Sequence, residues 1–238
     1  MLATHFTLQG KGGIGKSLVS FIFLQYLKSI KGNVVAIDAD PINQTLQNFK
    51  NINAEFFPLV ENEDFNTINF DKLIHTILSD TENDYFIDNG SSTFIQLSTY
   101  ILETEILDLI RNNNRMTYMH MIITGGTSLL DNLNVFKFWA SQKNVKIIVW
   151  LNEFFGKIEG EGKKFTEMSV YNESKANVAG IITLSTRNIH YAKNMKEMLD
   201  KKMTFDEAIS STEFDIVAKQ RLTIIKRELF EQLNKIEF

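Results

Sequence analysis

A glycine-rich segment near the N-terminus constrains the fold more than any other feature of this 238-residue sequence. Residues 10–17 read Gly-Lys-Gly-Gly-Ile-Gly-Lys-Ser, so a glycine, four residues, a second glycine, a lysine and a serine follow one another. An apolar run at residues 5–9 precedes the segment, and a helical pattern at residues 16–31, closed by Gly32, follows it. A strand, a glycine loop and a helix in this order indicate a phosphate-binding loop.

Each part of this pattern suits a nucleoside triphosphate with its metal ion. Glycines let backbone N–H groups face phosphate oxygens without a clashing Cβ atom, and the start of the helix adds a favourable dipole. Lys16 supplies positive charge to the outer phosphates, and Ser17 offers a hydroxyl to Mg²⁺. We therefore expect ATP and Mg²⁺ as cofactors, with the nucleotide held by Gly10, Lys11, Gly12, Gly13, Ile14, Gly15, Lys16, Ser17 and Leu18.

Short apolar runs alternate with helical patterns along the rest of the chain. The runs expected to form strands are residues 5–9, 33–38, 85–88, 118–124, 145–151 and 178–185. Strands that are almost continuously apolar and are separated by helices predict a parallel sheet covered on both faces. The fold class is therefore α/β, a single doubly wound, mainly parallel sheet. Ligands of such folds bind beyond the carboxyl ends of the strands.

Composition limits the remaining possibilities. Only two prolines are present and no stretch has the composition of a linker, so we expect one domain, residues 1–238, ending in C-terminal helices. The absence of cysteine excludes thiolate metal sites and iron–sulfur ligation. No signal peptide or membrane-span pattern is visible, so we expect a cytoplasmic protein. Twelve acids and one base between Glu55 and Asp108 predict a solvated acidic face rather than a generic nucleic-acid binder.

Two strands end in aspartates that suit metal and water chemistry. The run at residues 33–38 leads into Asp38-Ala39-Asp40, and the run at residues 85–88 ends at Asp88. An acid at the carboxyl end of a strand beside a phosphate loop can orient a water molecule or bind Mg²⁺. The alternative for Asp88 is a cap of the tight loop that follows, Asn89-Gly90-Ser91-Ser92.

Lys11 and the two glycines after it sharpen the pattern. The string Lys-Gly-Gly-Ile-Gly-Lys-Ser resembles the deviant Walker A motif of ParA, MinD, ArsA and nitrogenase iron proteins. In that family two subunits sandwich two nucleotides, and the signature lysine reaches the phosphates of the partner's ATP. The resemblance therefore implies an ATP-dependent homodimer in which Lys11 and Lys16 are catalytic. The alternative for Lys11 is a solvated loop lysine.

The segment after the second strand is similar to the Asp-x-Asp-Pro switch I sequence of ParA proteins. By that resemblance Asp40 positions the attacking water and binds Mg²⁺ with Ser17, while Asp38 is structural. The family's asparagine stands four residues after the second aspartate, where this chain has Gln44 and places Asn43 one residue earlier. Asp88 resembles the Walker B acid, another Mg²⁺ ligand through water, although the usual Pro-Pro does not follow it.

Farther along the chain the family reads adenine from two loops. Asn152 ends a strand where the family often places an asparagine that contacts the base, and Ser185-Thr186-Arg187 matches the position of the second loop. Segments at residues 150–156, 203–208 and 219–222 look like those of TraL and StbB proteins of conjugative plasmids. The resemblance thus implies a slow, partner-stimulated ATPase that acts with plasmid or conjugation proteins in conjugation, stability or positioning.

Two other functions fit the same scaffold: a metabolic synthetase, and a nucleotide-gated interaction module with little turnover. ParA relatives also coat DNA without reading sequence, and Lys193, Lys196, Lys201 and Lys202 are candidates for that contact. Apolar residues at helical spacing from Ile216 to Ile236 favour a packed helix over a membrane-docking tail, because acids interleave with the bases. Thr204 with Glu207 predicts a capping box.

Overall fold

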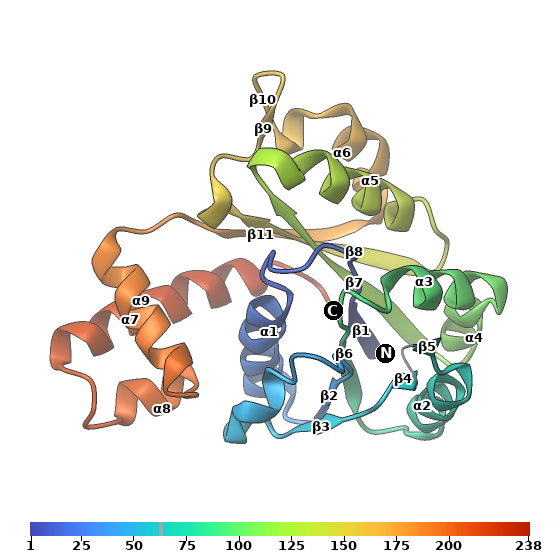
Figure 1. Ribbon diagram of the computed structural model, residues 1–238, viewed down its shortest axis with the longest axis horizontal. Coiled ribbons are helices and arrows are strands. Elements are labelled where there is room, and N and C mark those ends of the chain that lie inside the picture. The colour runs from blue at the N-terminus through green and yellow to red at the C-terminus, as the bar shows by residue number, and fades with distance from the viewer. Residues whose placement is uncertain (62–63) are drawn as a thin grey trace.

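The computed structural model describes residues 1–61 and 64–238 and is built around one parallel sheet of seven strands (Figure 1). The strand order is β11-β8-β7-β1-β6-β2-β3, and every neighbouring pair is parallel. The sheet strands are β1 (Leu2–Thr7), β2 (Val34–Asp38), β3 (Ala54–Phe56), β6 (Asp84–Asp88), β7 (Arg115–Thr124), β8 (Val145–Asn152) and β11 (Val178–Leu184). Two antiparallel pairs lie outside it: β4 (Val60–Glu61) with β5 (Asp64–Phe65), and β9 (Glu159–Gly160) with β10 (Lys163–Lys164).

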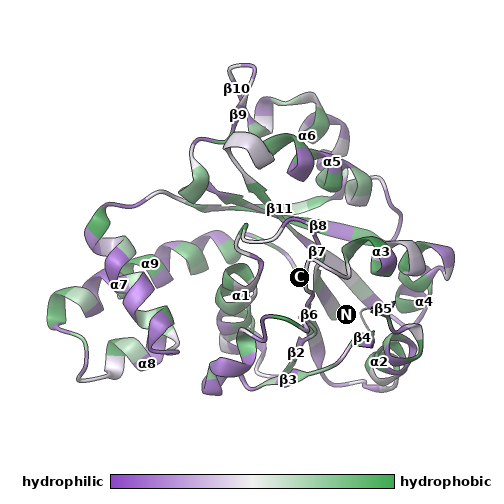
Figure 2. Cartoon of the chain, in the orientation of Figure 1, coloured by the Kyte–Doolittle hydropathy of each residue, from purple (hydrophilic) through white to green (hydrophobic). Residues whose placement is uncertain are grey.

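Helices cover both faces of the sheet, as the alternating patterns predict. On one face lie α1 (Lys16–Lys31) and α9 (Ile216–Leu233), which contact the strands, with α7 (Ile189–Asp200) and α8 (Phe205–Ser210) packed on α9 in the same apolar cluster. The other packs against α2 (Thr67–Ser79), α3 (Phe94–Glu103), α4 (Ile106–Asn112), α5 (Leu129–Ala140) and α6 (Ser169–Ser174). Hydrophobic residues are frequent in the strands and in α1, whereas hydrophobic and hydrophilic residues alternate along the outer helices (Figure 2). The doubly wound α/β fold is confirmed.

Some strand boundaries differ from the sequence prediction. The first strand spans Leu2–Thr7 instead of residues 5–9, because at Gln9 the side chain, and not the backbone, bonds to β7. β7 begins at Arg115, three residues before the predicted start. Arg115 is buried and its guanidinium donates to the carbonyl oxygens of Asn83, at 3.0 Å, and of Asp80. A charged residue can therefore continue a buried strand when backbone oxygens satisfy it.

The C-terminal segment forms a packed helix, as its spacing predicts. Leu222, Ile225, Leu229 and Leu233 on α9 are buried in the cluster that also holds α1. The predicted capping box opens α8, where the Thr204 side chain accepts from the backbone N–H of Glu207. In the residues that the structure describes, no helix has the length and apolar character needed to cross a membrane.

A cluster of rings lies beneath the middle of the sheet on the α1 face. Trp150 Nε1–H donates to His120 Nδ1 at 3.0 Å, so the proton of neutral His120 is on Nε2, which donates to His5 Nδ1 at 3.1 Å. The His5 ring stacks on Tyr118 with centroids 4.9 Å apart, and Phe238 meets its edge at 6.0 Å. Both histidines are buried. These contacts are those of packing residues in the core.

Candidate nucleotide-binding site

The glycine loop lies between the carboxyl end of β1 and the start of α1. Gly13 and Gly15 have φ angles of 73° and 102°, in the left-handed region that side chains rarely adopt. At Gly10 the reason is space, because a Cβ atom there would lie 2.9 Å from Phe94 Cδ1. The loop conformation therefore needs glycine at three of the positions that the motif supplies.

Two amide side chains hold this loop at its ends. The Gln9 amide donates to the Ile122 carbonyl at 3.0 Å and accepts the Ile122 N–H at 2.7 Å, so it continues the β1–β7 ladder by side chain. Asn152, at the end of β8, donates to the Ile14 carbonyl at 2.9 Å and accepts the Phe154 N–H at 3.2 Å. Asn152 retains a second amide hydrogen, so it can hold the loop and still face a base.

The two lysines of the loop lie in different surroundings. Lys16 is buried, and its ammonium donates to the Lys11 carbonyl at 2.9 Å. Burial lowers the pKa of Lys16, while the nearby carboxylates of Asp88 and Asp40 oppose that shift. The Lys11 ammonium instead lies 3.9 Å from Asp131 on α5, and both of these side chains are exposed. Lys16 is thus directed into the loop, and Lys11 is directed away from it.

Asp88 is buried at the end of β6 and faces α1. One carboxylate oxygen accepts from the hydroxyls of Thr7, at 2.5 Å, and Ser20, at 2.9 Å. Burial raises the pKa of Asp88, and hydrogen bonds from Thr7, Ser20 and Ser17 act against that rise. A carboxylate and a serine hydroxyl beside a phosphate loop supply the oxygen ligands that Mg²⁺ prefers, with waters and phosphate oxygens for its remaining positions. The donor set therefore fits this ion.

The aspartates at the end of β2 and in the loop after it have different partners. Asp38 is fully buried and accepts the backbone N–H of Leu46 at 3.0 Å and that of Asp40 at 3.3 Å. Burial first and Asp88 second raise the pKa of Asp38 to about 6. Asp40 is partly exposed and accepts from two backbone N–H groups of its own loop, at 2.9 and 3.1 Å. A Cβ atom on Gly90 would lie 3.0 Å from the Asp40 carboxylate, so the loops after β2 and β6 touch there.

A pocket of about 290 Å³ opens beside the loop. Its walls come from α1, the turn after β8, the segment of residues 185–188 after β11, and helices α7 and α9. Leu18, Asn152 and Thr186 lie at its wall, and Ile225 and Leu229 of α9 line it as well. A mostly apolar pocket with a few polar groups suits a planar base. The predicted base-contacting residues are therefore gathered at one cavity.

Comparison with known proteins defines the family. No protein-family model matches the chain. Two Escherichia coli proteins named TraL are each 37% identical to it, over 238 and 236 residues, and each match spans 98% of both chains. The chain belongs to the TraL family. The predicted resemblance to TraL proteins is thereby confirmed.

Solved structures similar to this TraL-family chain include the MinD cell division protein of Aquifex aeolicus, with 15% identity, a TM-score of 0.52 and coverage of 99% of this chain and 98% of that protein. A ParA family ATPase of Chlorobium tepidum TLS has 13% identity, a TM-score of 0.52 and coverage of 95% and 99%. MinD complexed with Mg-ADP from Pyrococcus horikoshii OT3 has 14% identity, a TM-score of 0.51 and coverage of 99% and 97%. At these identities the likeness establishes the P-loop fold.

The TraL-family chain brings most predicted site residues together and leaves one apart. Lys16, Ser17, Asp40 and Asp88 meet around the start of α1, while Lys11 lies toward α5. Sequence reasoning missed Gln9, which anchors the loop to a strand 113 residues later. A single glutamine before a glycine loop gives no signal of that contact, because its partner is a backbone group of any residue type.

Proposed function

We propose that this TraL-family protein binds Mg-ATP at residues 10–17, dimerises with ATP and hydrolyses it slowly in plasmid conjugation, stability or positioning. One observation carries the proposal. A buried lysine, a serine hydroxyl and the carboxylates of Asp88 and Asp40 converge on a glycine loop that is held in shape from both ends. ATP and Mg²⁺ match this set in charge and in donor chemistry.

The proposed roles follow from the contacts. Lys16 exchanges the Lys11 carbonyl for phosphate oxygens, which compensate its buried charge better than a neutral carbonyl does. Ser17 and Asp88 hold Mg²⁺, and Asp40 orients the attacking water at the mouth of the site. Bound Mg²⁺ neutralises charge that develops on the phosphates during transfer. Asn152 donates its second amide hydrogen to the base while it holds the loop at Ile14.

The surface around the loop supports a homodimer. Five large apolar residues, each between 68% and 78% exposed, follow the carboxyl ends of five different strands: Ile42, Ile95, Leu130, Phe154 and Ile189. Because the carboxyl ends of parallel strands lie at one edge of the sheet, these residues are on the side of the molecule that carries the glycine loop, and exposed apolar residues on one side favour an interaction surface. A second copy on this side would cover them. It would also bring its Lys11 toward the nucleotide of the first copy.

Light scattering of the protein with ATP, with ADP and without nucleotide tests binding and dimerisation together. We expect a dimer mass with Mg-ATP and a monomer mass in the other two samples. A monomer in all three, with ATP bound by calorimetry, would leave an ATP-binding protein and remove the dimer from the proposal.

A second candidate is a nucleotide-gated interaction module with little turnover. Its support is that the Asp40 carboxylate already accepts two N–H groups of its own loop, which competes with holding a water. Steady-state ATP hydrolysis, with and without DNA or a partner extract, separates the two candidates. Turnover that stays at the level of a Lys16→Ala protein in every sample would favour the module.

Nonspecific DNA has less support as a partner. Of the four lysines that suggested it, Lys196 lies 2.6 Å from Asp200 and Lys201 lies 2.6 Å from Glu213. Lys202 stands over the ring of Phe49, 5.7 Å from its centroid. DNA binding through these residues would be steeply salt-dependent. A gel shift with ATP-bound protein at low salt tests it, and absence of retardation removes DNA from the proposal.

A further inference from the structure

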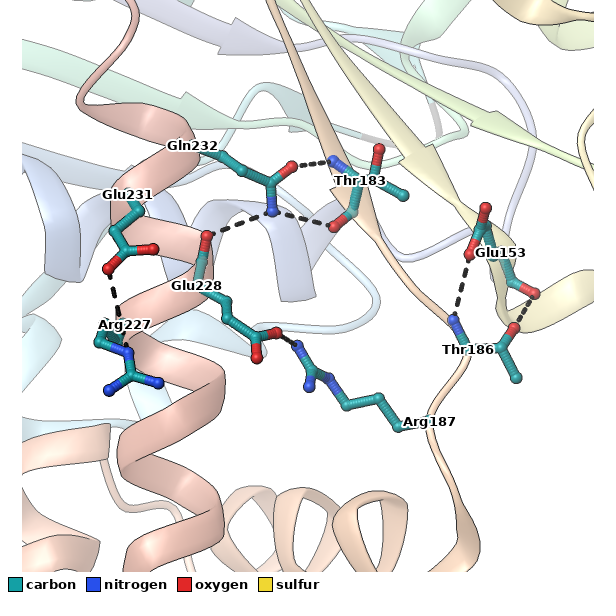
Figure 3. Close-up of polar contacts among 8 residues, drawn as sticks. All are labelled: Glu153, Thr183, Thr186, Arg187, Arg227, Glu228, Glu231 and Gln232. Atoms are coloured by element: carbon teal, nitrogen blue, oxygen red, sulfur yellow. Dashed lines mark hydrogen bonds and ion pairs between the residues drawn. The ribbon is translucent and has the colours of Figure 1, made fainter.

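The segment of residues 185–188 forms a wall of the base pocket and is held from one side by the turn Glu153–Phe155 (Figure 3). The Thr186 hydroxyl donates to the Glu153 carbonyl at 2.8 Å, and the Thr186 N–H donates to the Glu153 carboxylate at 3.3 Å. These bonds fix the segment to the end of β8, next to Asn152.

The same segment is held from the other side by α9. The Arg187 guanidinium donates to the Glu228 carboxylate at 2.6 Å (Figure 3). It also lies over the ring of Tyr191, 5.7 Å from the centroid, so Arg187 joins the segment to both α7 and α9. The Arg187 side chain is 22% exposed and that of Glu228 is 45% exposed, so the pair is partly screened by solvent and is moderately stronger than a fully exposed pair.

Helix α9 is itself fixed to the strand that leads into this segment. Gln232 accepts the Thr183 N–H of β11 at 2.8 Å and donates to the Thr183 carbonyl at 3.3 Å. Its amide also donates to the backbone carbonyl of Glu228 at 3.3 Å. Glu228 therefore sits on a helical turn whose position relative to β11 is set. Ile225 and Leu229 of the same helix line the base pocket.

We propose that Glu228 is a positioning residue for the nucleobase: through Arg187 it holds residues 185–188 against the pocket, so α9 determines how tightly the base is bound. The inference rests on the proposed binding of ATP at residues 10–17. The effect should differ between the base and the phosphates, because the phosphate loop is anchored by Gln9 and Asn152 and not by Glu228. Loss of the Glu228 charge should weaken contacts with the base and leave contacts with the phosphates unchanged.

The test compares two ligands by calorimetry, Mg-ATP and Mg-tripolyphosphate, on wild type and Glu228→Gln. We expect Glu228→Gln to weaken Mg-ATP binding about three- to tenfold, the range of a partly buried ion pair, and to change Mg-tripolyphosphate binding less than about twofold. Glu231→Gln is the matched control. Glu231 lies on the same helix, 3.9 Å from Arg227, and both side chains are more than 60% exposed. We expect it to leave both affinities unchanged.

A charge exchange provides a second readout. In the double variant Arg187→Glu/Glu228→Arg the pair is reversed but retained, so ATP affinity should recover relative to Arg187→Glu alone. The inference is overturned if Glu228→Gln leaves ATP affinity unchanged, if it weakens both ligands by the same factor, or if the exchange restores nothing. Wild type that binds neither ligand would instead overturn the proposed function itself, and this inference with it.

Discussion

Two groups of buried titratable side chains lie on the central strands of the sheet. Asp38 and Asp88 stand at the carboxyl ends of β2 and β6, whereas His5 and His120 stand within β1 and β7. The aspartates accept hydrogen bonds from hydroxyls and loop N–H groups beside a glycine loop. The histidines bond to each other and to Trp150 among packed rings. Burial is common to both groups, so position along the strand distinguishes a ligand site from a core.

Burial favours the neutral form of both groups, so it raises the pKa of the aspartates and lowers the pKa of the histidines. It raises the pKa of Asp38 to about 6 and also raises that of Asp88. It lowers the pKa of His120 to about 3 and places that of His5 well below its usual value. At pH 7 the histidines are therefore neutral, and the core contains no unpaired charge from them. Asp38 is ionised at a cost, and a cation bound near these carboxylates would reduce the repulsion between them.

The largest effect expected at the strand ends comes from Lys16. Lys16→Ala should abolish detectable ATP binding, a loss of at least about a hundredfold, because a charge-assisted contact with the outer phosphates disappears. The fold should persist, since the Lys16 ammonium contacts a loop carbonyl and not the core. Calorimetry with Mg-ATP and circular dichroism check both statements. Lys72→Ala on the exposed face of α2 is the control and should bind as wild type does.

Lys11 and Asp40 should affect the proposed dimer in opposite ways. Lys11→Ala should leave ATP-bound monomers and reduce hydrolysis about a thousandfold, as loss of a cation supplied by a partner does elsewhere. Asp40→Ala should bind ATP and accumulate the dimer, because hydrolysis no longer separates the subunits. Sedimentation with Mg-ATP distinguishes the two masses. If Lys11→Ala still forms a dimer, Lys11 is a solvated loop lysine with no role in the partner subunit. If Asp40→Ala hydrolyses ATP normally, Asp38 or Asp88 is the better candidate for orienting the water.

For the buried histidines in the middle of the sheet, we expect the largest effect on the free energy of unfolding at acidic pH. The unfolded chain binds protons at its histidines near pH 6.5, while the buried pair stays neutral, so the free energy of unfolding falls as pH falls from 7 to 5. His120, with a pKa of about 3, accounts for about 2 kcal/mol of this loss, and His5 adds to it. The raised pKa values of Asp38 and Asp88 act in the opposite direction. In His120→Gln the loss should be smaller by about 2 kcal/mol, the share of that histidine. Urea unfolding at pH 5, 6 and 7 measures it, and an unchanged slope would contradict the neutral pair.

The smallest predicted effect has the opposite sign. A folded pKa of about 6 for Asp38, above its unfolded value, makes the folded state lose stability as pH rises through 6. Asp38→Asn keeps an acceptor for the Leu46 N–H and removes this loss. The rise in stability between pH 5 and 7 should therefore be about 1 kcal/mol larger in the variant than in wild type. The same urea series detects it, and a smaller rise would show that Asp38 titrates below this range.

The sequence could predict what depends on neighbours along the chain. The glycine loop, its flanking strand and helix, and the Thr204 cap are local patterns, and the structure contains all of them. Contacts between distant residues could not be foreseen. Asn152 meets Ile14 across 138 positions and the histidines meet across 115. Strand β3, only three residues long, has no periodicity to recognise.

The side-chain bond between Gln232 and Thr183 also bears on self-association. β11 is the last strand on its side of the sheet, so its outer backbone groups can pair with a strand of another chain and begin aggregation. At Thr183 the Gln232 amide already occupies both the donor and the acceptor. A side-chain amide has an N–H donor and a C=O acceptor, as a peptide bond does. The Gln232 side chain therefore makes the two hydrogen bonds that a neighbouring strand would make at this residue. At this residue of the edge strand, a helix side chain therefore occupies the backbone groups with which another chain would pair.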